Sequence, residues 1–429
     1  MRDLAFAMIW VAVLPLLLIS AYTGALVWVW CTLLSPNELL YGFMAGIPFS
    51  KVAAVPTIFL TFFGKDKKDP HFDVMWFLII LFCIGGTISW FDSISPSPLA
   101  TDLYEKLIKE MVLALIITTV MTTRDRIERL VLVIVLSVGF LAFKEGLIFL
   151  LTAGGHRVTG NGALGDNNGL AMVLLMIIPL TYYLARYFAV RIVRIGMWLV
   201  LGLSLVTVIA TYSRGGLVGL AVLGAFAVKN SSRRITALLI VVLAGASLYL
   251  LTPGSWFERM DTIESANNDL SFMGRVVAWK ISLLIAMEHP LFGGGMHAVQ
   301  QQPVWDTYKQ ELDLVNFVDT PPPDQLAHAA HSIYFEVLGD LGFVGLTLFL
   351  GILGIALWNC RQLYRISRGH PSLVWAADLG RMLQISLVIY LTTGAALSQA
   401  YLELLYVLIS MASRCHRTAR LILAAETCE

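Results

Sequence analysis

Apolar runs of about 20 residues recur along the chain, and they limit what it can fold into more than any other feature. A run of this length crosses the ~30 Å hydrocarbon core of a bilayer as an α-helix. Hydrophobic residues make up 58% of the 429 positions and charged residues only 14%, which excludes a soluble globular domain. The sequence therefore predicts an all-α polytopic membrane protein.

About twelve transmembrane helices are expected, with a long polar loop between the ninth and the tenth. The first run follows Arg2 like a signal peptide but continues without a small-residue cleavage pattern, so we expect a retained helix that crosses once. The expected spans are residues 6–30, 43–64, 74–92, 105–122, 128–151, 169–185, 195–212, 216–228, 235–251, 332–358, 379–397 and 399–413.

Lysine and arginine residues gather in six segments that all fall on one side of this arrangement, the side expected for Arg2. Because such residues in short loops mark the cytoplasmic side, both termini are expected to be cytoplasmic and the other polar loops to face outward. The six clusters are Lys65, Lys67 and Lys68; Arg124, Arg126 and Arg129; Arg186, Arg191 and Arg194; Lys229, Arg233 and Arg234; Arg361, Arg365 and Arg368; and Arg414, Arg417 and Arg420.

Two arginines are expected on the outward side. Arg214 lies in TYSRGG between two apolar runs, where a charge costs ~3 kcal/mol and so faces the protein interior or a water-filled cavity, unless it snorkels to the interface. Arg275 lies in a GRxxxW pattern before an amphipathic segment of about fourteen residues, which predicts a helix on the outer interface. Either guanidinium could hold an anion, and the plainer alternative for Arg275 is a salt bridge or a lipid-headgroup contact.

Histidines cluster in and around the long polar loop. His331 stands where this loop enters a membrane helix, and it could take a proton from a hydroxyl as a general base or simply cap the helix. His328 could share its face, but no Glu or Cys at ligand spacing accompanies the pair, so no metal site is expected. Glu336 follows on the same helix and could orient the histidine or bind an arginine.

A second outward loop, HRVTGNGALGDNNG, contributes His156, Arg157, Asp166 and Asn167. Its Gly and Asx residues predict a structured turn that leads into a helix, with Asn167 or Asn168 as the N-cap. The same side chains could instead line a sugar site.

Outward arginines and an outward histidine beside a membrane suit one kind of substrate. A lipid-linked diphosphate carries its negative charge at the interface, where guanidinium forks match its oxygens. Displacing the diphosphate from a sugar carbon leaves a stabilised anion, while a base takes the proton of the attacking hydroxyl. This chemistry needs no cofactor and no metal, and none is expected.

The order of these motifs resembles the O-antigen ligase and O-antigen polymerase (Wzy-like) superfamily. The resemblance rests on TYSRGG, then GRVVAWK and HPLFGGG, a long polar loop, and HSIYFEVLGDLGFVGL. The stretches MRDLAFAMIW, SPNELLYGFMAGIPFSKVAAV and GDNNGLAM are similar to a subgroup of O-glycosylation ligases associated with exosortase A. The likeness divides the chain into an N-terminal transmembrane region (1–169), a ligase-like core (170–358) with a periplasmic loop (252–331), and a C-terminal transmembrane hairpin and tail (359–429).

The resemblance implies a glycosyltransferase of the bacterial inner membrane. It would move an oligosaccharide or polysaccharide from undecaprenyl diphosphate to an acceptor hydroxyl at the periplasmic face, with inversion and without a metal. Carried over by motif, Arg214 and Arg275 bind the diphosphate and His331 is the base. The acceptor, either a glycolipid such as lipid A core or a protein Ser/Thr, does not carry over, and no nucleic-acid partner is implied.

Two other functions stay open. A polysaccharide polymerase would use another lipid-linked glycan as its acceptor and would give a ladder of products. A transporter or flippase of lipid-linked glycans is suggested by Lys144 and Glu145, which lie within an expected span and are either functional or paired internally. The absence of a repeated half in the sequence weakly disfavours the transporter.

Overall fold

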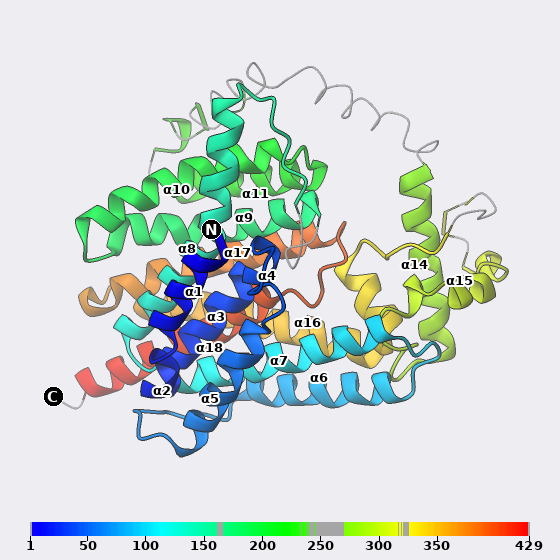
Figure 1. The fold of residues 1–429 in the computed structure, drawn as a ribbon, viewed down its shortest axis with the longest axis horizontal. Coiled ribbons are helices and arrows are strands. Elements are labelled where there is room, and N and C mark those ends of the chain that lie inside the picture. Colours follow the sequence, from blue (N-terminus) through cyan, green and yellow to red (C-terminus); the bar gives the residue numbers. More distant parts are fainter. Residues whose placement is uncertain are drawn as a thin grey trace.

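The computed structural model describes residues 2–160, 166–231, 233–236, 238–239, 245, 270–315, 317–318, 320 and 326–427. Its regular elements within those ranges are helices, as the apolar runs predict (Figure 1). Seven of the described helices are long and apolar enough to cross a membrane. The chain is therefore a multi-pass helical membrane protein, and the larger count of about twelve spans stays a prediction.

Most described helices overlap the expected spans, but α7 begins seven residues earlier than expected, α16 ends nine residues later and α18 ends thirteen residues later. The expected span at 235–251 lies almost entirely outside the described residues. The helices are α1 (Arg2–Val13), α2 (Leu16–Ile19), α3 (Ala21–Leu34), α4 (Pro36–Leu39), α5 (Phe49–Phe63), α6 (Val74–Phe91), α7 (Pro98–Val120), α8 (Arg124–Leu151), α9 (Asn167–Tyr187), α10 (Arg191–Ala210), α11 (Arg214–Asn230), α14 (Leu270–Glu288), α15 (Gln302–Tyr308), α16 (Ile333–Ser367), α17 (Val374–Gly394) and α18 (Glu403–Glu426), with short 3₁₀ turns η3 (Ala298–Gln300), η4 (Leu312–Leu314) and η5 (Pro371–Leu373).

The polar connections gather at two opposite ends of the helix bundle. We call one the loop end; it contains residues 35–48, 92–97, 211–213 and 395–402, where for example Ile94 N donates to Gly294 O. We call the other the basic end; it contains residues 64–73, 121–123, 188–190 and 368–370, where for example Arg126 donates to the carbonyl oxygen of Lys67 and Arg417 to the carboxylate of Asp69. Helix α9 lies at the centre of the bundle, with 89% of its apolar window buried.

The first 34 residues differ from the sequence prediction. The chain turns back at Ser20, so that α1 and α3 form a hairpin in which Phe6 stacks on Trp30 with ring centroids 5.8 Å apart. Asp3 accepts hydrogen bonds from the backbone N–H groups of Gly42 and Met44 at the loop end, while the turn of the hairpin contacts Asp66 at the basic end. The single crossing over 6–30 is wrong.

The same hairpin changes where the N-terminus lies. Arg2 lines a cavity with His156 and Arg157, at the loop end, and so does not join the six basic clusters. The two termini therefore lie at opposite ends of the bundle. Hydropathy misses this reversal because the segment is apolar throughout and breaks only at Pro15 and Ser20.

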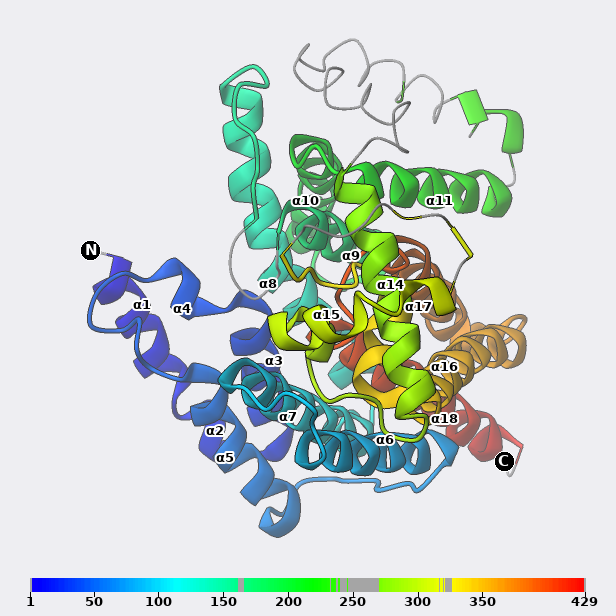
Figure 2. The same ribbon diagram turned by 90° about the vertical axis from the view of Figure 1, so that its right-hand side faces the viewer.

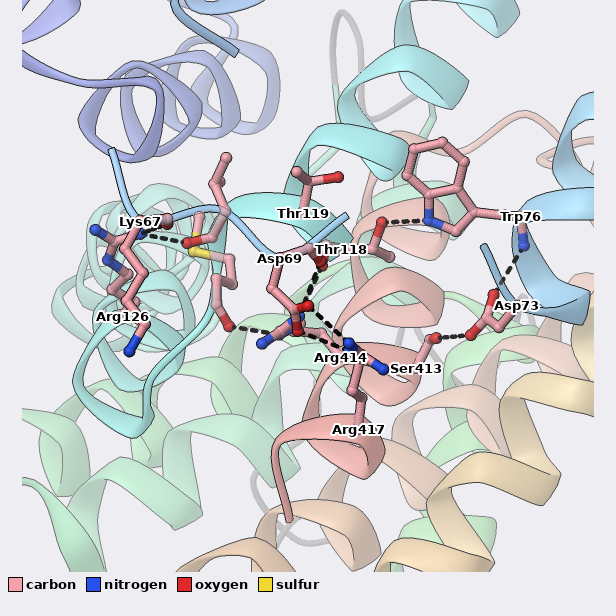
Figure 3. Close-up of polar contacts among 12 residues, drawn as sticks. Lys67, Asp69, Asp73, Trp76, Thr118, Thr119, Arg126, Ser413, Arg414 and Arg417 are labelled. Atoms are coloured by element: carbon pink, nitrogen blue, oxygen red, sulfur yellow. Dashed lines mark hydrogen bonds and ion pairs between the residues drawn. The ribbon is translucent and has the colours of Figure 1, made fainter. Parts of the chain in front are cut away.

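The basic end is held by one carboxylate and two arginines (Figure 3). Asp69 accepts hydrogen bonds from Arg414 at 2.8 Å and from Arg417 at 2.6 and 2.7 Å, and these hydrogen bonds hold the pKa of its carboxyl well below the ordinary value. The Arg414 side chain is 2% exposed and also donates to the carbonyl oxygen of Met121. This cluster fastens α18 to the connections that follow α5 and α7.

Helix α14 is oriented differently from the spans. It lies across the loop end of α16, facing the viewer in Figure 2 and standing upright at the right of Figure 1. Its described length is 19 residues, longer than the fourteen-residue segment seen in the sequence. A helix crossing the ends of the spans fits the predicted interfacial position of Arg275.

Candidate active site

The N-termini of α9 and α11 meet at the loop end. Asp166 caps α9, with Oδ1 accepting from Asn168 N and Gly169 N at 3.0 Å each, and Ser213 caps α11 by accepting from Gly216 N at 3.0 Å. The two caps are joined because Ser213 Oγ donates to Asn168 Oδ1 at 2.7 Å. The expected N-cap at Asn167 or Asn168 is thus one or two residues late.

Asn167 and Arg214 stand at the start of these two helices, one buried and one half-buried. Asn167 is buried and donates through Nδ2 to the carbonyl oxygen of Thr211 at 2.8 Å, so it shapes the turn before α11. Arg214 is the first residue of α11 and is half-buried. Helix N-termini carry partial positive charge, so two of them beside a guanidinium make a region that favours an anion.

His331 is held by its backbone rather than by its ring. Its φ is +45°, a left-handed conformation that is uncommon outside glycine. Its N–H donates to Ser398 Oγ at 2.7 Å, and the preceding carbonyl oxygen, of Ala330, accepts from Trp279 Nε1 at 2.6 Å. Strain of this kind persists only where the surroundings enforce it, and it concentrates at functional sites.

The GRxxxW pattern accounts for how Arg275 reaches this histidine. Arg275 and Trp279 are four residues apart on α14 and therefore lie on one face. Trp279 stacks on Phe335 of α16 with ring centroids 5.2 Å apart and bonds to the chain next to His331. The tryptophan thus directs the arginine face of α14 toward the histidine.

Burial and nearby charges both act on His331. Burial lowers the pKa of its imidazole, and the positive charge of Arg275 lowers it further, while the carboxylate of Asp166 acts in the opposite direction. His328 adds a smaller lowering effect. Burial and the charge of Arg275 therefore favour the neutral imidazole that a general base requires.

The HPLFGGG motif fixes α14 relative to α16. Gly293 and Gly342 both have φ of +68°, and Gly342 is the kink inside α16. Gly294 N donates to Gly339 O at 2.9 Å and Phe343 N donates to Pro290 O at 2.9 Å. A Cβ on Gly342 would lie 2.8 Å from two backbone atoms, so the two segments approach as closely as glycine allows.

Glu336 does not contact His331 or an arginine among the described residues. Its Oε2 instead accepts from Ala400 N at 2.8 Å, and Asp340 Oδ2 accepts from the Tyr401 hydroxyl at 3.1 Å. Both carboxylates therefore position the segment that carries Ser398, the partner of His331. Ser398 was not predicted, because a lone serine between apolar residues gives no signal in the sequence.

His156 and Arg157 lie in the connection that follows α8. They line a cavity of about 260 Å³ with Arg2 and Glu38. His156 Nε2 lies 2.7 Å from Glu145 Oε2, and Lys144 Nζ lies 2.8 Å from the other oxygen of the same carboxylate. The intramembrane pair is thus satisfied internally, which removes the observation that suggested a transporter.

His328 is exposed at the edge of the site and packs edge-on against Trp305, with ring centroids 5.9 Å apart. Within the described part of the chain, no group of three His, Cys, Asp or Glu side chains is arranged to hold a metal ion.

Together the helices and the candidate site describe a polytopic membrane protein with arginines and a histidine at one end. Residues 199–350 match the family described as O-antigen ligase, and residues 1–189 match a family of unknown function (DUF5935). The chain is an enzyme that carries an O-antigen ligase domain over residues 199–350, and hence a membrane glycosyltransferase; the family of this domain implies a lipid-linked glycan substrate. No curated protein matches the chain.

The O-antigen ligase match contains Arg214, Arg275 and His331. The family that residues 1–189 match is one of unknown function. The finer likeness to O-glycosylation ligases associated with exosortase A therefore stays a prediction.

Proposed function

We propose that the enzyme transfers an oligosaccharide or polysaccharide from undecaprenyl diphosphate to a hydroxyl of lipid A core or of a protein. The observation that supports this most directly is the half-buried His331 with Arg275 beside it at the loop end. A base next to a cation is what the attack of a hydroxyl on a glycosyl diphosphate requires.

In this proposal Arg275 and Arg214 hold the diphosphate. Arg275 lies on α14, which crosses the ends of the spans (Figures 1 and 2), and a lipid-linked diphosphate would lie at the same interface. Arg214 begins α11, whose N-terminus adds partial positive charge. Both stabilise the negative charge that grows on the leaving diphosphate.

His331 takes the proton. The acceptor oxygen forms a bond to the anomeric carbon while the bond from that carbon to the diphosphate oxygen breaks, so a single displacement inverts the configuration. The proton of the hydroxyl passes to His331 and then to solvent, and polyprenyl diphosphate leaves with the electron pair. No metal or cofactor is called on.

The proposed orientation places the loop end in the periplasm of a bacterial inner membrane. It is supported by the described basic clusters at the opposite end, since Lys and Arg mark the cytoplasmic side. A polymerase would use the same residues with another lipid-linked glycan as acceptor, and it is separated from a ligase by its ladder of products.

A reconstituted transfer assay tests the proposal. Purified enzyme would be incubated with undecaprenyl-diphosphate glycan and with lipid A core, pilin-like and glycan acceptors, and mass spectrometry would detect free undecaprenyl diphosphate with a glycosylated acceptor. We expect His331→Ala to lower the transfer rate at least ~100-fold while donor binding is retained, because the base is lost. Arg275→Gln is expected to weaken donor binding.

Two matched controls lie at the basic end. His370→Ala and Arg361→Gln change exposed residues of the same types and should transfer at the wild-type rate. A folded His331→Ala enzyme with full activity would rule out the base assignment.

A further inference from the structure

A second cavity lies at the loop end, between the N-terminal helices and the start of α18. Its volume is about 420 Å³, within the ~300–1,000 Å³ range of small-molecule sites. Helices α3, α5 and α7, which lie side by side in both views, supply most of its wall (Figures 1 and 2). Its lining is dominated by charged side chains, and neither the O-antigen ligase match nor the roles proposed above account for it.

Glu110 is the unusual member of this lining. It is 4% exposed, and neither of its carboxylate oxygens has a hydrogen-bond partner within the described residues. A buried polar group left without hydrogen bonds costs about 1–3 kcal/mol, and more when it is charged. Such a group in the wall of a cavity is satisfied when a bound molecule supplies the donor.

Lys106 lies between two carboxylates. Its ammonium is 2.9 Å from Glu403 Oε1 and 4.0 Å from Glu110 Oε1, so the closer pair uses one of its three N–H donors. The inner wall therefore offers carboxylate acceptors and ammonium donors side by side, with one more negative than positive charge. Hydroxyl groups can donate to the carboxylates and accept from the ammonium at the same time.

The remaining lining also suits a molecule rich in hydroxyl groups. Thr32 and Ser50 present hydroxyls 3.4 Å apart, and an exposed Lys51–Glu105 pair stands 2.8 Å apart at the wall. The excess of carboxylates disfavours an anion such as a lipid phosphate.

The cavity is joined to His331 through one short segment. Ser398 accepts from the His331 N–H, Ala400 donates to Glu336, and Glu403 lines the cavity. A molecule held by Glu403 therefore lies against the same stretch of chain that fixes the proposed base.

We infer that this cavity is a saccharide-binding site, built around Glu110, Lys106 and Glu403, that holds a sugar unit of the glycan; the inference rests on the proposed function. The sugar could belong to the donor or to a glycan acceptor, and both present the same hydroxyl chemistry. Most of the site comes from residues 1–189, so it assigns a role to the region matched by a family of unknown function.

Glu110→Gln and Glu403→Gln test the inference by kinetics. Glutamine keeps the shape of the side chain. At Glu110, whose carboxylate oxygens have no hydrogen-bond partner within the described residues, the fold is expected to survive. Glu403→Gln also removes the ion pair with Lys106 and is expected to be the less stable variant. We expect the KM for one substrate to rise about tenfold, because each variant loses a hydrogen bond between a charged group and the sugar. The kcat is expected to change less than about threefold. The substrate whose KM rises is the one that the cavity holds.

Glu426→Gln is the matched control, because this glutamate is exposed at the far end of α18. Unchanged KM values for both substrates in folded Glu110→Gln enzyme would overturn the inference. So would a fall in kcat alone, since it would mean that these residues only position the His331 segment.

A binding experiment separates this inference from the proposed function. Saturation-transfer NMR with the oligosaccharide released from the donor should show binding to the wild type and to Glu426→Gln, and loss of it in Glu110→Gln. If the wild type transferred nothing to any acceptor but showed this pattern, the proposed function would fail and the saccharide site would stand. Equal binding by the wild type and Glu110→Gln would overturn the site.

Discussion

At the scale of single residues, His331 is defined by what surrounds it. Its left-handed backbone is held by Ser398 on one side and by the Trp279–Ala330 hydrogen bond on the other. Burial and Arg275 then keep the ring neutral at the pH where a base is needed.

The first prediction concerns pH. Because burial and Arg275 lower the pKa of His331, the unprotonated base persists below the ordinary histidine value of about 6.5. The acid limb of kcat/KM for transfer should therefore have its midpoint below about 6.5. In Arg275→Gln, which removes the neighbouring cation, that midpoint should move upward even though the overall rate falls.

Rate measurements from pH 4.5 to 8 would check this, with Arg361→Gln as the control that leaves the limb in place. A midpoint above the ordinary value, or one that ignores Arg275, would contradict the assignment of His331 as a base flanked by this arginine.

The sequence contained part of this site. Arg214, Arg275 and His331 were predicted because arginines near a membrane are costly and because the motif order resembles a family, and their roles stay predictions. Two features escaped: Ser398, which has no motif, and the true partner of Glu336, which is a backbone N–H supplied from α17–α18. Contacts between segments far apart in sequence leave no local pattern.

At the scale of elements, the glycines of HPLFGGG and GDLG make the join between α14 and α16. Gly342 has φ +68° and ψ −168°, a region essentially restricted to glycine. Its neighbours are backbone atoms of residues 289–293, which cannot rotate away. This join sets how far Arg275 lies from His331.

Gly342→Ala should accordingly destabilise the enzyme by about 3 kcal/mol, since the residue is both strained and in collision with backbone. We expect a lower melting temperature in detergent and a loss of transfer that exceeds the loss of folded protein at the assay temperature. Gly354→Ala, in the same helix with nothing within 4 Å of its added Cβ, should be neutral or slightly stabilising. Equal stability of the two variants would show that the join is not tight.

Most helices could be predicted from the sequence, because each is a long apolar run with helix-breaking residues at its ends. The exception is α1–α3, where an unbroken apolar segment folds back on itself. The composition of a segment shows whether it is long and apolar enough to cross a membrane. Whether the chain continues straight or folds back within that segment depends on packing, here of Phe6 against Trp30.

At the scale of the whole molecule, the bundle separates its charges. The basic end is tied by Asp69 and its arginines, while the loop end holds His331, Arg275 and the saccharide cavity. The N-terminus lies at the loop end through Asp3 and Arg2.

Cysteine labelling would test this sidedness. The described native cysteines Cys31, Cys360 and Cys415 are buried and Cys83 is half-buried, so a Cys428→Ser background should label weakly. Positions 2, 41 and 67 are all exposed, so a cysteine at each can react once the reagent reaches it. In intact cells, a membrane-impermeant maleimide should modify Arg2→Cys and Tyr41→Cys at the loop end. It should reach Lys67→Cys, at the basic end, only after permeabilisation. Protection of both Arg2→Cys and Lys67→Cys until permeabilisation would favour a single first crossing. Labelling of Lys67→Cys in intact cells, with Arg2→Cys and Tyr41→Cys protected, would invert the proposed orientation.

The cavity wall has a consequence for how such enzymes diverge. Its charged side chains come mainly from the first 113 residues, whereas the proposed base and its arginines come from a separate, later part of the chain. Substitutions in the first part can alter which sugar is recognised and leave proton transfer intact. In this proposal, sugar recognition and the transfer reaction are encoded by different parts of one gene. Exchanging the part that encodes the first 113 residues between relatives would exchange sugar preference, while the reaction stayed the same.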